Sequence, residues 1–150
     1  MLRIVLDTNV LIDADRGEGS YPKRILDLVV SGEVQAVVTS SVRREQELIV
    51  GRLMRDRVLK RAVEEYLALA DEAEPAPVSV IIEDQEDLKL ITAAVGGKAQ
   101  FLVTADDHLL SLGEYQGCRI VTPSGFWRFW EQQDGGSASW ANWAKQVLGR

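Results

Sequence analysis

The segment 2–9 near the N-terminus constrains the fold more than any other part of the chain. It runs Leu-Arg-Ile-Val-Leu and then changes at once to Asp-Thr-Asn. An apolar run with Val and Ile predicts a buried strand, so Asp7 is placed at the carboxyl end of that strand. Ligands of open α/β sheets bind at this end, above all where the strand order reverses. The question for the rest of the chain is which other acidic side chains converge on Asp7.

Strand and helix patterns alternate after this segment. A short apolar turn is predicted at 10–12. Ser40 or Ser41 is the candidate N-cap of a later helix, at 42–53. Further strands are predicted at 34–39, 78–82, 99–104 and 118–121. Helices are predicted at 20–31, 42–53, 55–73, 84–95 and 122–132, with a short one ending near 112. The alternation indicates one α/β domain over 1–133 with a parallel sheet between helices. A flexible break and a last helix are expected over 134–150.

Composition narrows the class of protein. The 150 residues are 46% hydrophobic, which allows one domain with a real core. No apolar run approaches the ~20 residues of a membrane span, and the N-terminus enters a strand directly, so we expect no signal peptide. The single Cys118 favours a reducing cytoplasm and a buried, inert thiol. A net charge of −6 argues against bulk coating of nucleic acid, but permits an acidic pocket that holds metal.

One helix pattern places an acid on an inward face. Val42, Glu45, Ile49 and Leu53 follow helical spacing along one side of the helix at 42–53, while Glu47 lies on another side. A carboxylate among apolar residues is costly to bury alone, so it is normally paired, protonated or bound to metal. Glu45 is therefore a candidate functional residue.

Two further acids follow the same logic. The helix at 84–95 has an inward stripe that begins with Asp84 and Asp87, while Glu83 and Glu86 are expected to face solvent. The strand at 99–104 ends at Asp106 and Asp107. An acid at a strand end is more often a simple helix cap. Several carboxylates in one pocket, however, repel one another unless a divalent cation neutralises them, and oxygen ligands favour Mg²⁺ or Mn²⁺ over zinc.

At this point the sequence resembles a known family. The segment 4–12, Ile-Val-Leu-Asp-Thr-Asn-Val-Leu-Ile, resembles the opening motif of PIN-domain ribonucleases. The segment 103–110 is similar to that family's V-T-G-D-x-x-L-L segment, with Ala105 where Gly is usual. The segment 84–87 matches the third acidic segment, and Glu45 the second. The resemblance covers about 1–130 and is closest to the VapC-like toxin branch of toxin–antitoxin systems.

The resemblance implies a fold, a chemistry and a site. The fold would be a single Rossmann-like domain with a five-stranded parallel sheet in the order 3-2-1-4-5. The chemistry would be hydrolysis of RNA phosphodiester bonds with Mg²⁺ or Mn²⁺, which would polarise the scissile phosphate and activate a water molecule. The metal-binding and catalytic residues would be Asp7, Glu45, Asp87 and Asp106. The residues expected around them are Thr8, Asn9, Thr104 and Asp107, of which Asp107 is also the alternative to Asp106 as ligand.

Other features leave two interpretations open. Seven of the 17 basic residues fall between 43 and 61. They form either a solvated helical hairpin with ordinary ion pairs or a rim that contacts RNA phosphates; the candidates for that rim are Arg43, Arg44, Arg52 and Arg55. His108 is interpreted as a surface or salt-bridge residue.

The aromatic residues near the C-terminus also have two interpretations. They are Phe126, Trp127, Phe129, Trp130, Trp140 and Trp143. Packing of the terminal helices on the sheet is favoured, and an interface with an antitoxin or with a second copy in a homodimer is the alternative.

Three other functions share part of this pattern. An aspartyl-nucleophile phosphohydrolase needs a second Asp two residues after Asp7, but position 9 is Asn. A phosphoacceptor receiver module expects an acidic pair at the first strand's end and a Lys after the fourth, which this chain fits poorly. A catalytically silent PIN-like scaffold that binds RNA or protein remains the alternative. The complete set of four acids favours a nuclease over this scaffold, and the single cysteine favours the cytoplasm.

Overall fold

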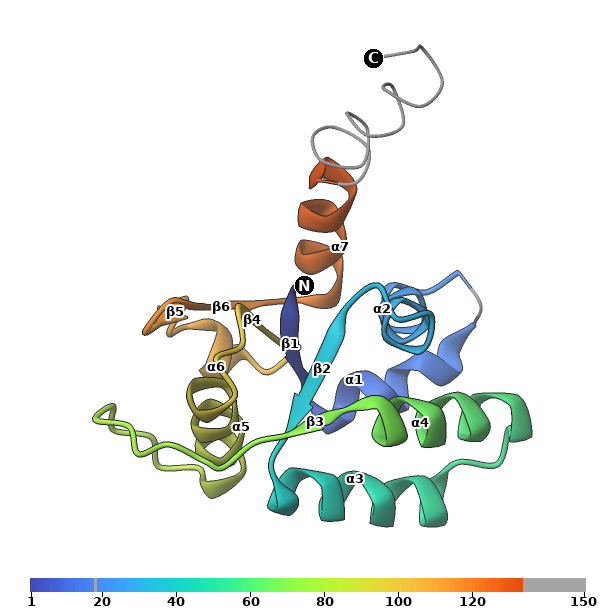
Figure 1. The fold of residues 1–150 in the computed structure, drawn as a ribbon, viewed down its shortest axis with the longest axis horizontal. Helices are drawn as coiled ribbons and strands as arrows, with labels where there is room; N and C mark the ends of the chain where they lie inside the picture. Colours follow the sequence, from blue (N-terminus) through green and yellow to red (C-terminus); the bar gives the residue numbers. More distant parts are fainter. Residues whose placement is uncertain (18, 134–150) are drawn as a thin grey trace.

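A largely parallel sheet runs through the middle of the molecule, with helices on both faces (Figure 1). The computed structural model describes residues 1–17 and 19–133. The strands are β1 (Arg3–Leu6), β2 (Gln35–Val38), β3 (Asp71–Glu72), β4 (Phe101–Val103), β5 (Glu114–Tyr115) and β6 (Cys118–Val121). Their order is β3-β2-β1-β4-β6-β5, and the β5–β6 pair alone among them is antiparallel. The predicted α/β class and central strand order are therefore confirmed.

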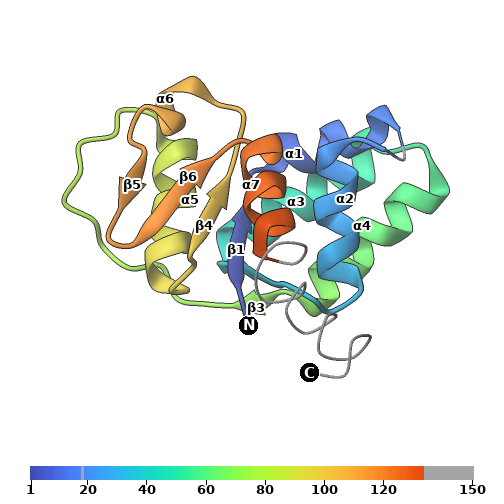
Figure 2. The same ribbon diagram turned by 90° about the horizontal axis from the view of Figure 1, so that it is seen from above.

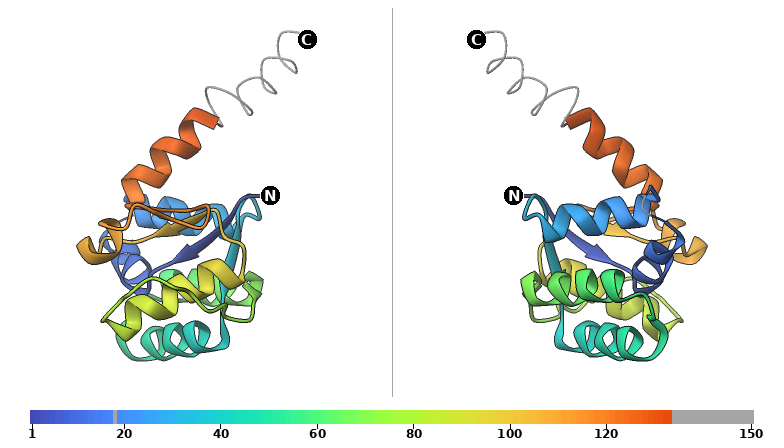
Figure 3. Two further views of the ribbon diagram at one scale, coloured as in Figure 1. Left: turned by 90° about the vertical axis from the view of Figure 1, so that its left-hand side faces the viewer. Right: turned by 90° about the vertical axis from the view of Figure 1, so that its right-hand side faces the viewer.

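The helices connect the strands and cover the sheet. They are α1 (Thr8–Asp13), α2 (Tyr21–Val30), α3 (Ser40–Leu53), α4 (Arg57–Leu69), α5 (Gln85–Gly96), α6 (Asp107–Leu110) and α7 (Pro123–Glu131), with a 3-10 turn η1 (Ala14–Arg16) after α1. Figure 3 shows α2 and α5 on opposite sides of the sheet. None of the helices in the described part of the chain is long and apolar enough to cross a membrane.

Strand β1 joins the two halves of the core. Ile4 and Leu6 belong to a cluster with side chains of α2, α4 and α7, whereas Val5 packs on the other face with Leu90 and Ile91 of α5. Neighbouring side chains of a strand point to opposite faces, so an unbroken apolar run is what a strand covered on both sides requires. Burying each such side chain contributes about 1.5–3 kcal/mol.

The third strand is not where the sequence pattern placed it. The segment 78–82 is not a strand; its apolar side chains, Val78, Val80 and Ile82, pack against the core cluster around α5. The strand beside β2 is instead β3, only two residues long, which follows the end of α4 at Leu69 rather than at 73. Burial of alternate side chains explains the alternating pattern without any pairing of the backbone.

Two further predictions were wrong in detail. The segment expected as an apolar turn at 10–12 belongs to helix α1, which begins directly after Asp7. Helix α3 is capped by Thr39, whose Oγ1 accepts a hydrogen bond from the Val42 N–H, and not by Ser40 or Ser41.

The sheet also has one strand more than expected. Strand β5 forms a hairpin with β6, and the turn between them has positive φ at Gln116 (47°) and Gly117 (83°). Positive φ at both central residues is typical of the tight turns that connect antiparallel strands. Within β6, Cys118 is buried as predicted, and burial followed by the charge of Glu114 raises the pKa of its thiol to about 12.

Helix α7 lies over the sheet beside β1 and β4 (Figure 2), and its aromatic side chains pack against the core there. Phe126 is fully buried, and the Phe101 ring lies 5.3 Å from the Phe126 ring and 4.6 Å from the Phe129 ring, measured between centroids. Trp127 and Trp130 are partly buried against the same cluster. All four aromatic residues therefore contact the core, which agrees with the packing interpretation, and three of them are only partly buried. The predicted break and helix at 134–150, with Trp140 and Trp143, lie outside the described residues.

Candidate metal centre

Asp7 and Asp106 lie at the carboxyl ends of adjacent strands. Strands β1 and β4 pair in parallel with Leu6 opposite Val103, and the Asp7 N–H donates to the Val103 carbonyl at 3.0 Å. Each acid caps the helix behind its strand: Asp7 accepts from the Asn9 N–H, and Asp106 from the His108 N–H at 2.8 Å. Both therefore lie at the point of strand-order reversal.

A buried hydroxyl links these two residues. Thr104 is fully buried; its Oγ1 donates to Asp7 Oδ2 at 2.7 Å and accepts from the Asp106 N–H at 3.0 Å. Burial raises the pKa of Asp7 although the bond from Thr104 acts in the opposite direction, and the charge of Asp106 raises the pKa further. Thr104 thus fixes the geometry of two acids that repel each other.

Asp87 reaches the same place from the first turn of α5. Its residue surface is only 6% exposed. No N–H or hydroxyl group of the residues described here donates to its carboxylate, which shares a hydrogen bond with the carboxyl group of Asp106. Burial, followed by the charges of Asp106 and Asp84, raises the pKa of Asp87 to about 6. A buried acid that faces other acids favours a bound cation or a proton.

Glu45, on α3, lines the same cleft as the three aspartates. Its Oε2 accepts a bond from Thr8 Oγ1 at 2.6 Å, and its Oε1 lies 3.6 Å from Lys89 Nζ. Burial opposes ionisation, but the bonds with Glu86, Thr8 and Lys89 outweigh it, so the pKa of Glu45 is lowered. The pKa of Glu86 is raised, first by the hydrogen bond that it shares with Glu45. Glu86 is exposed as predicted, yet it also takes part in the site.

The four predicted acids line one cleft of about 330 Å³. Its other walls are formed by Thr8, Asn9, Ile12, Ile49, Asp84, Glu86 and Leu90. Asp107 is exposed and is not among the residues that line this cleft, so Asp106 is the better placed of the two. The donor set is rich in carboxylate oxygens, and one of the acids is buried without a hydrogen-bond donor. Such a set fits a hard divalent cation.

Gln46 was missed by the sequence analysis. It is fully buried, donates from Nε2 to the Leu6 carbonyl at 2.9 Å and accepts from the Tyr66 hydroxyl at 2.7 Å. Its bonds connect α4 to the end of β1, immediately before Asp7. The spacing of Gln46 between Val42 and Val50, both buried, was the signal for its burial.

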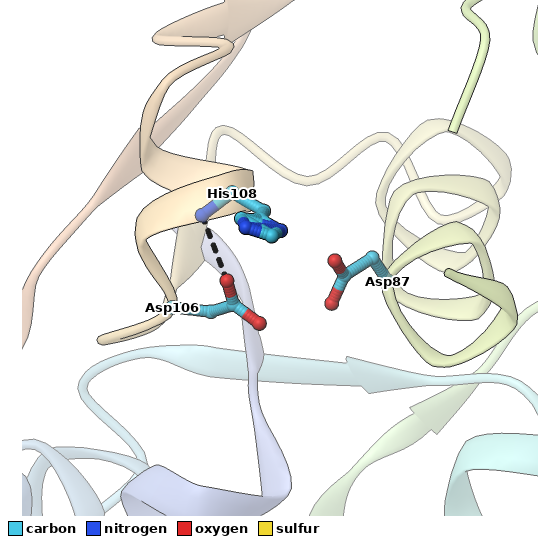
Figure 4. A group of neighbouring side chains, drawn as sticks. All are labelled: Asp87, Asp106 and His108. Carbon is cyan, nitrogen blue, oxygen red and sulfur yellow. Dashed lines mark hydrogen bonds between the residues drawn. The ribbon is translucent and has the colours of Figure 1, made fainter. Parts of the chain in front are cut away.

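Lys89 and His108 are the other two residues that were missed or assigned differently. Lys89 extends from α5 toward Glu45 and Glu86, where it partly neutralises that wall. His108 was expected to be a surface or salt-bridge residue; it is exposed, but its imidazole lies beside Asp87 and Asp106 (Figure 4). The Lys89–Glu86 pair is local, with i,i+3 spacing in α5. The approach of Lys89 to Glu45 and of His108 to Asp87 joins different elements, so local sequence does not indicate it.

The basic residues proposed for RNA contact divide into two groups. The Arg43 guanidinium pairs with Glu72 at 2.9 Å and donates to the Ala70 carbonyl at 3.3 Å, so it holds the end of α4 and β3 in place. Arg44, Arg52 and Arg55 are exposed. Arg52 lies two helical turns after Glu45, on the same side of α3.

The comparisons agree with this geometry. A family model described as PIN domain matches residues 3–108, more than half of the chain, so the chain belongs to the PIN-domain family. Among solved structures, it is similar to a chain in the crystal structure of VapBC2 from Rickettsia felis bound to a DNA fragment from their promoter. That match has 15% identity and a TM-score of 0.51 and covers 79% of this chain and 97% of the other. No curated protein matches the chain.

Proposed function

We propose that this protein is an endoribonuclease that requires Mg²⁺ or Mn²⁺ and hydrolyses phosphodiester bonds of RNA. The observation that carries the proposal is the convergence of Asp7, Glu45, Asp87 and Asp106, from four separate segments, on one cleft. The burial of Asp87 among other acids supports a cation there, because no basic side chain bonds to it within the described part of the chain.

The residues of the cleft would have different roles in the proposed reaction. Asp7, Asp87 and Asp106 would hold the cation, and Thr104 would keep Asp7 and Asp106 oriented. The bound cation would polarise the scissile phosphate and lower the pKa of a water molecule. Glu45, whose pKa is lowered, lines the same cleft and would either help to hold the cation or accept a proton. Arg44, Arg52 and Arg55 would contact the RNA backbone beyond the acidic cleft.

We further propose that the protein is the toxin of a toxin–antitoxin pair in the cytoplasm. The support is the family membership together with the fold likeness to a chain of VapBC2, whose structure contains DNA from its own promoter. An antitoxin would be a protein partner, and a homodimer is the other assembly that we expect. The competing function is a catalytically silent scaffold that binds RNA or protein.

The proposed function is tested by comparing RNA cleavage by the parent protein and by the Asp7→Asn variant. The parent protein should cleave a pool of structured and unstructured RNAs with Mn²⁺ and stop when a chelator is added. Mn²⁺ should also raise the parent Tm by binding to the native state. Asp7→Asn should lose both effects and still fold, because Asn can retain the cap of α1.

Glu45→Gln and Glu47→Gln are the matched pair for this experiment, since both remove one charge from α3. Glu47 is exposed and lies outside the acidic cleft, so Glu47→Gln should cleave like the parent. Glu45→Gln should lose most activity. Cleavage at the parent rate by Asp7→Asn would show that the assignment is wrong, and RNA binding without cleavage by the parent would favour the scaffold.

A further inference from the structure

We propose that His108 is a ligand of the metal, together with Asp87 and Asp106, and that it makes the site prefer Mn²⁺ to Mg²⁺. This inference rests on the proposed function and adds to it a nitrogen donor and a choice between the two ions. The four acids considered above supply oxygen atoms only.

The first observation is the geometry of the three side chains. One ligand atom from each of Asp87, Asp106 and His108 lies within 4.8 Å of the others. Figure 4 shows the two carboxylates and the imidazole facing a common space, although they come from α5, from the end of β4 and from α6. A shared cation would take one ligand atom from each of these three side chains.

The second observation is that, among the described residues, the hydrogen-bond partner of the Asp87 carboxylate is another acid, Asp106. Asp87 is more than nine-tenths buried and faces this space, and no N–H or hydroxyl donor of the described residues reaches its carboxylate. Leaving such an anion without a donor or a cation is unfavourable. A cation on the side of Asp106 and His108 is the partner that this arrangement lacks.

The third observation is that the other acids already have hydrogen-bond or ion-pair partners within the protein. Glu45 is bonded to Thr8 and lies near Lys89, and Asp7 Oδ2 accepts the Thr104 hydroxyl. Asp106 uses Oδ1 to cap α6, which leaves its Oδ2 for a ligand and also fixes the helix that carries His108. Asp87, Asp106 and His108 are therefore the groups best prepared for the first contacts with a cation.

The chemistry of the donor set gives the ion preference. Mg²⁺ is a hard ion that prefers oxygen ligands and retains several water molecules. Imidazole suits transition metals, and carboxylates suit Mn²⁺ as well as Mg²⁺. A site with two carboxylates and one imidazole therefore favours Mn²⁺.

The experiment uses the full chain without a histidine tag, at mildly alkaline pH. Because His108 is the only histidine, any imidazole nitrogen bound to Mn²⁺ must come from it. Pulsed electron paramagnetic resonance should detect a nitrogen coupled directly to bound Mn²⁺. The signal should change when histidine alone is labelled with ¹⁵N, and it should vanish in His108→Asn.

Metal titrations complete the test. His108→Asn should bind Mn²⁺ about tenfold more weakly or worse, since even outer-shell partners change metal affinity by about that much. Its affinity for Mg²⁺ should change far less, and Glu47→Gln should bind both ions like the parent. His108 is exposed, so the variant is expected to fold.

The outcomes separate the inference from the proposed function. If Mn²⁺ binds and supports cleavage without nitrogen coupling, and His108→Asn binds it equally well, the role of His108 is wrong and the nuclease proposal stands. If the parent binds neither ion, both proposals fail.

Discussion

At the scale of single residues, the buried Asp87 carboxylate reduces the stability of the metal-free protein once it is ionised. Its pKa in the folded protein is about 6, against an ordinary value of 3.8, mainly because it is buried. The folded state therefore binds a proton more tightly than the unfolded chain does. Without metal, the contribution of Asp87 makes the protein lose stability as the pH rises from about 4 to about 6.

Asp87→Asn should therefore stabilise the metal-free protein at neutral pH. The gain should be at most about 3 kcal/mol, since each unit of pKa shift corresponds to about 1.4 kcal/mol. Denaturant unfolding in the presence of a chelator measures it. The same variant should no longer be stabilised by Mn²⁺. A metal-free Asp87→Asn protein that is less stable than the parent would contradict the view that the site is strained by its charges.

At the scale of elements, the close crossing of α5 and the segment after α4 depends on one glycine. A Cβ at position 96 would lie 1.9 Å from the Glu74 carbonyl oxygen and 2.9 Å from the Ala76 nitrogen, both backbone atoms. Gly96→Ala must push this segment away from the end of α5. The cost should be about 3 kcal/mol or more in the free energy of unfolding, as for severe overpacking.

Gly51→Ala is the control, because nothing lies within 4 Å of a Cβ at this position inside α3. It should stabilise the protein by about 0.5–1 kcal/mol, since alanine favours a helix over glycine. Equal effects of the two substitutions on the denaturation midpoint would show that the crossing at Gly96 is not tight.

The same scale shows what sequence could and could not predict. The helical spacing in α3 correctly placed Glu45 toward the interior, but it chose a face one residue away from the buried one, so Leu53 is 57% exposed while Gln46 is fully buried. The burial of a polar residue such as Gln46 can be predicted only when its hydrogen-bond partner is known. That partner, Tyr66, lies on another helix. Likewise, β3 consists of two acidic residues, and its pairing is determined by β2 rather than by its own composition.

At the scale of the whole molecule, the order of the strands determines where the acids meet. The apolar run that ends at Asp7 and the one that ends at Asp106 were readable in sequence, and the parallel pairing of β1 with β4 brings their ends together. His108 could not be assigned in this way, because its approach to Asp87 depends on the packing of α6 against α5. The fold and the convergence of the four acids on one cleft were thus predictable, and the approach of His108 to Asp87 was not.

The central claim is that these acids share a divalent cation. Crystals grown with Mn²⁺ and measured near the manganese absorption edge test it most directly. We expect an anomalous peak in the acidic cleft, within coordination distance of the Asp87 and Asp106 carboxylates. Crystals of Asp7→Asn should show a weaker peak or none. A parent protein that cleaves RNA in Mn²⁺ but shows no peak in this cleft would contradict the account.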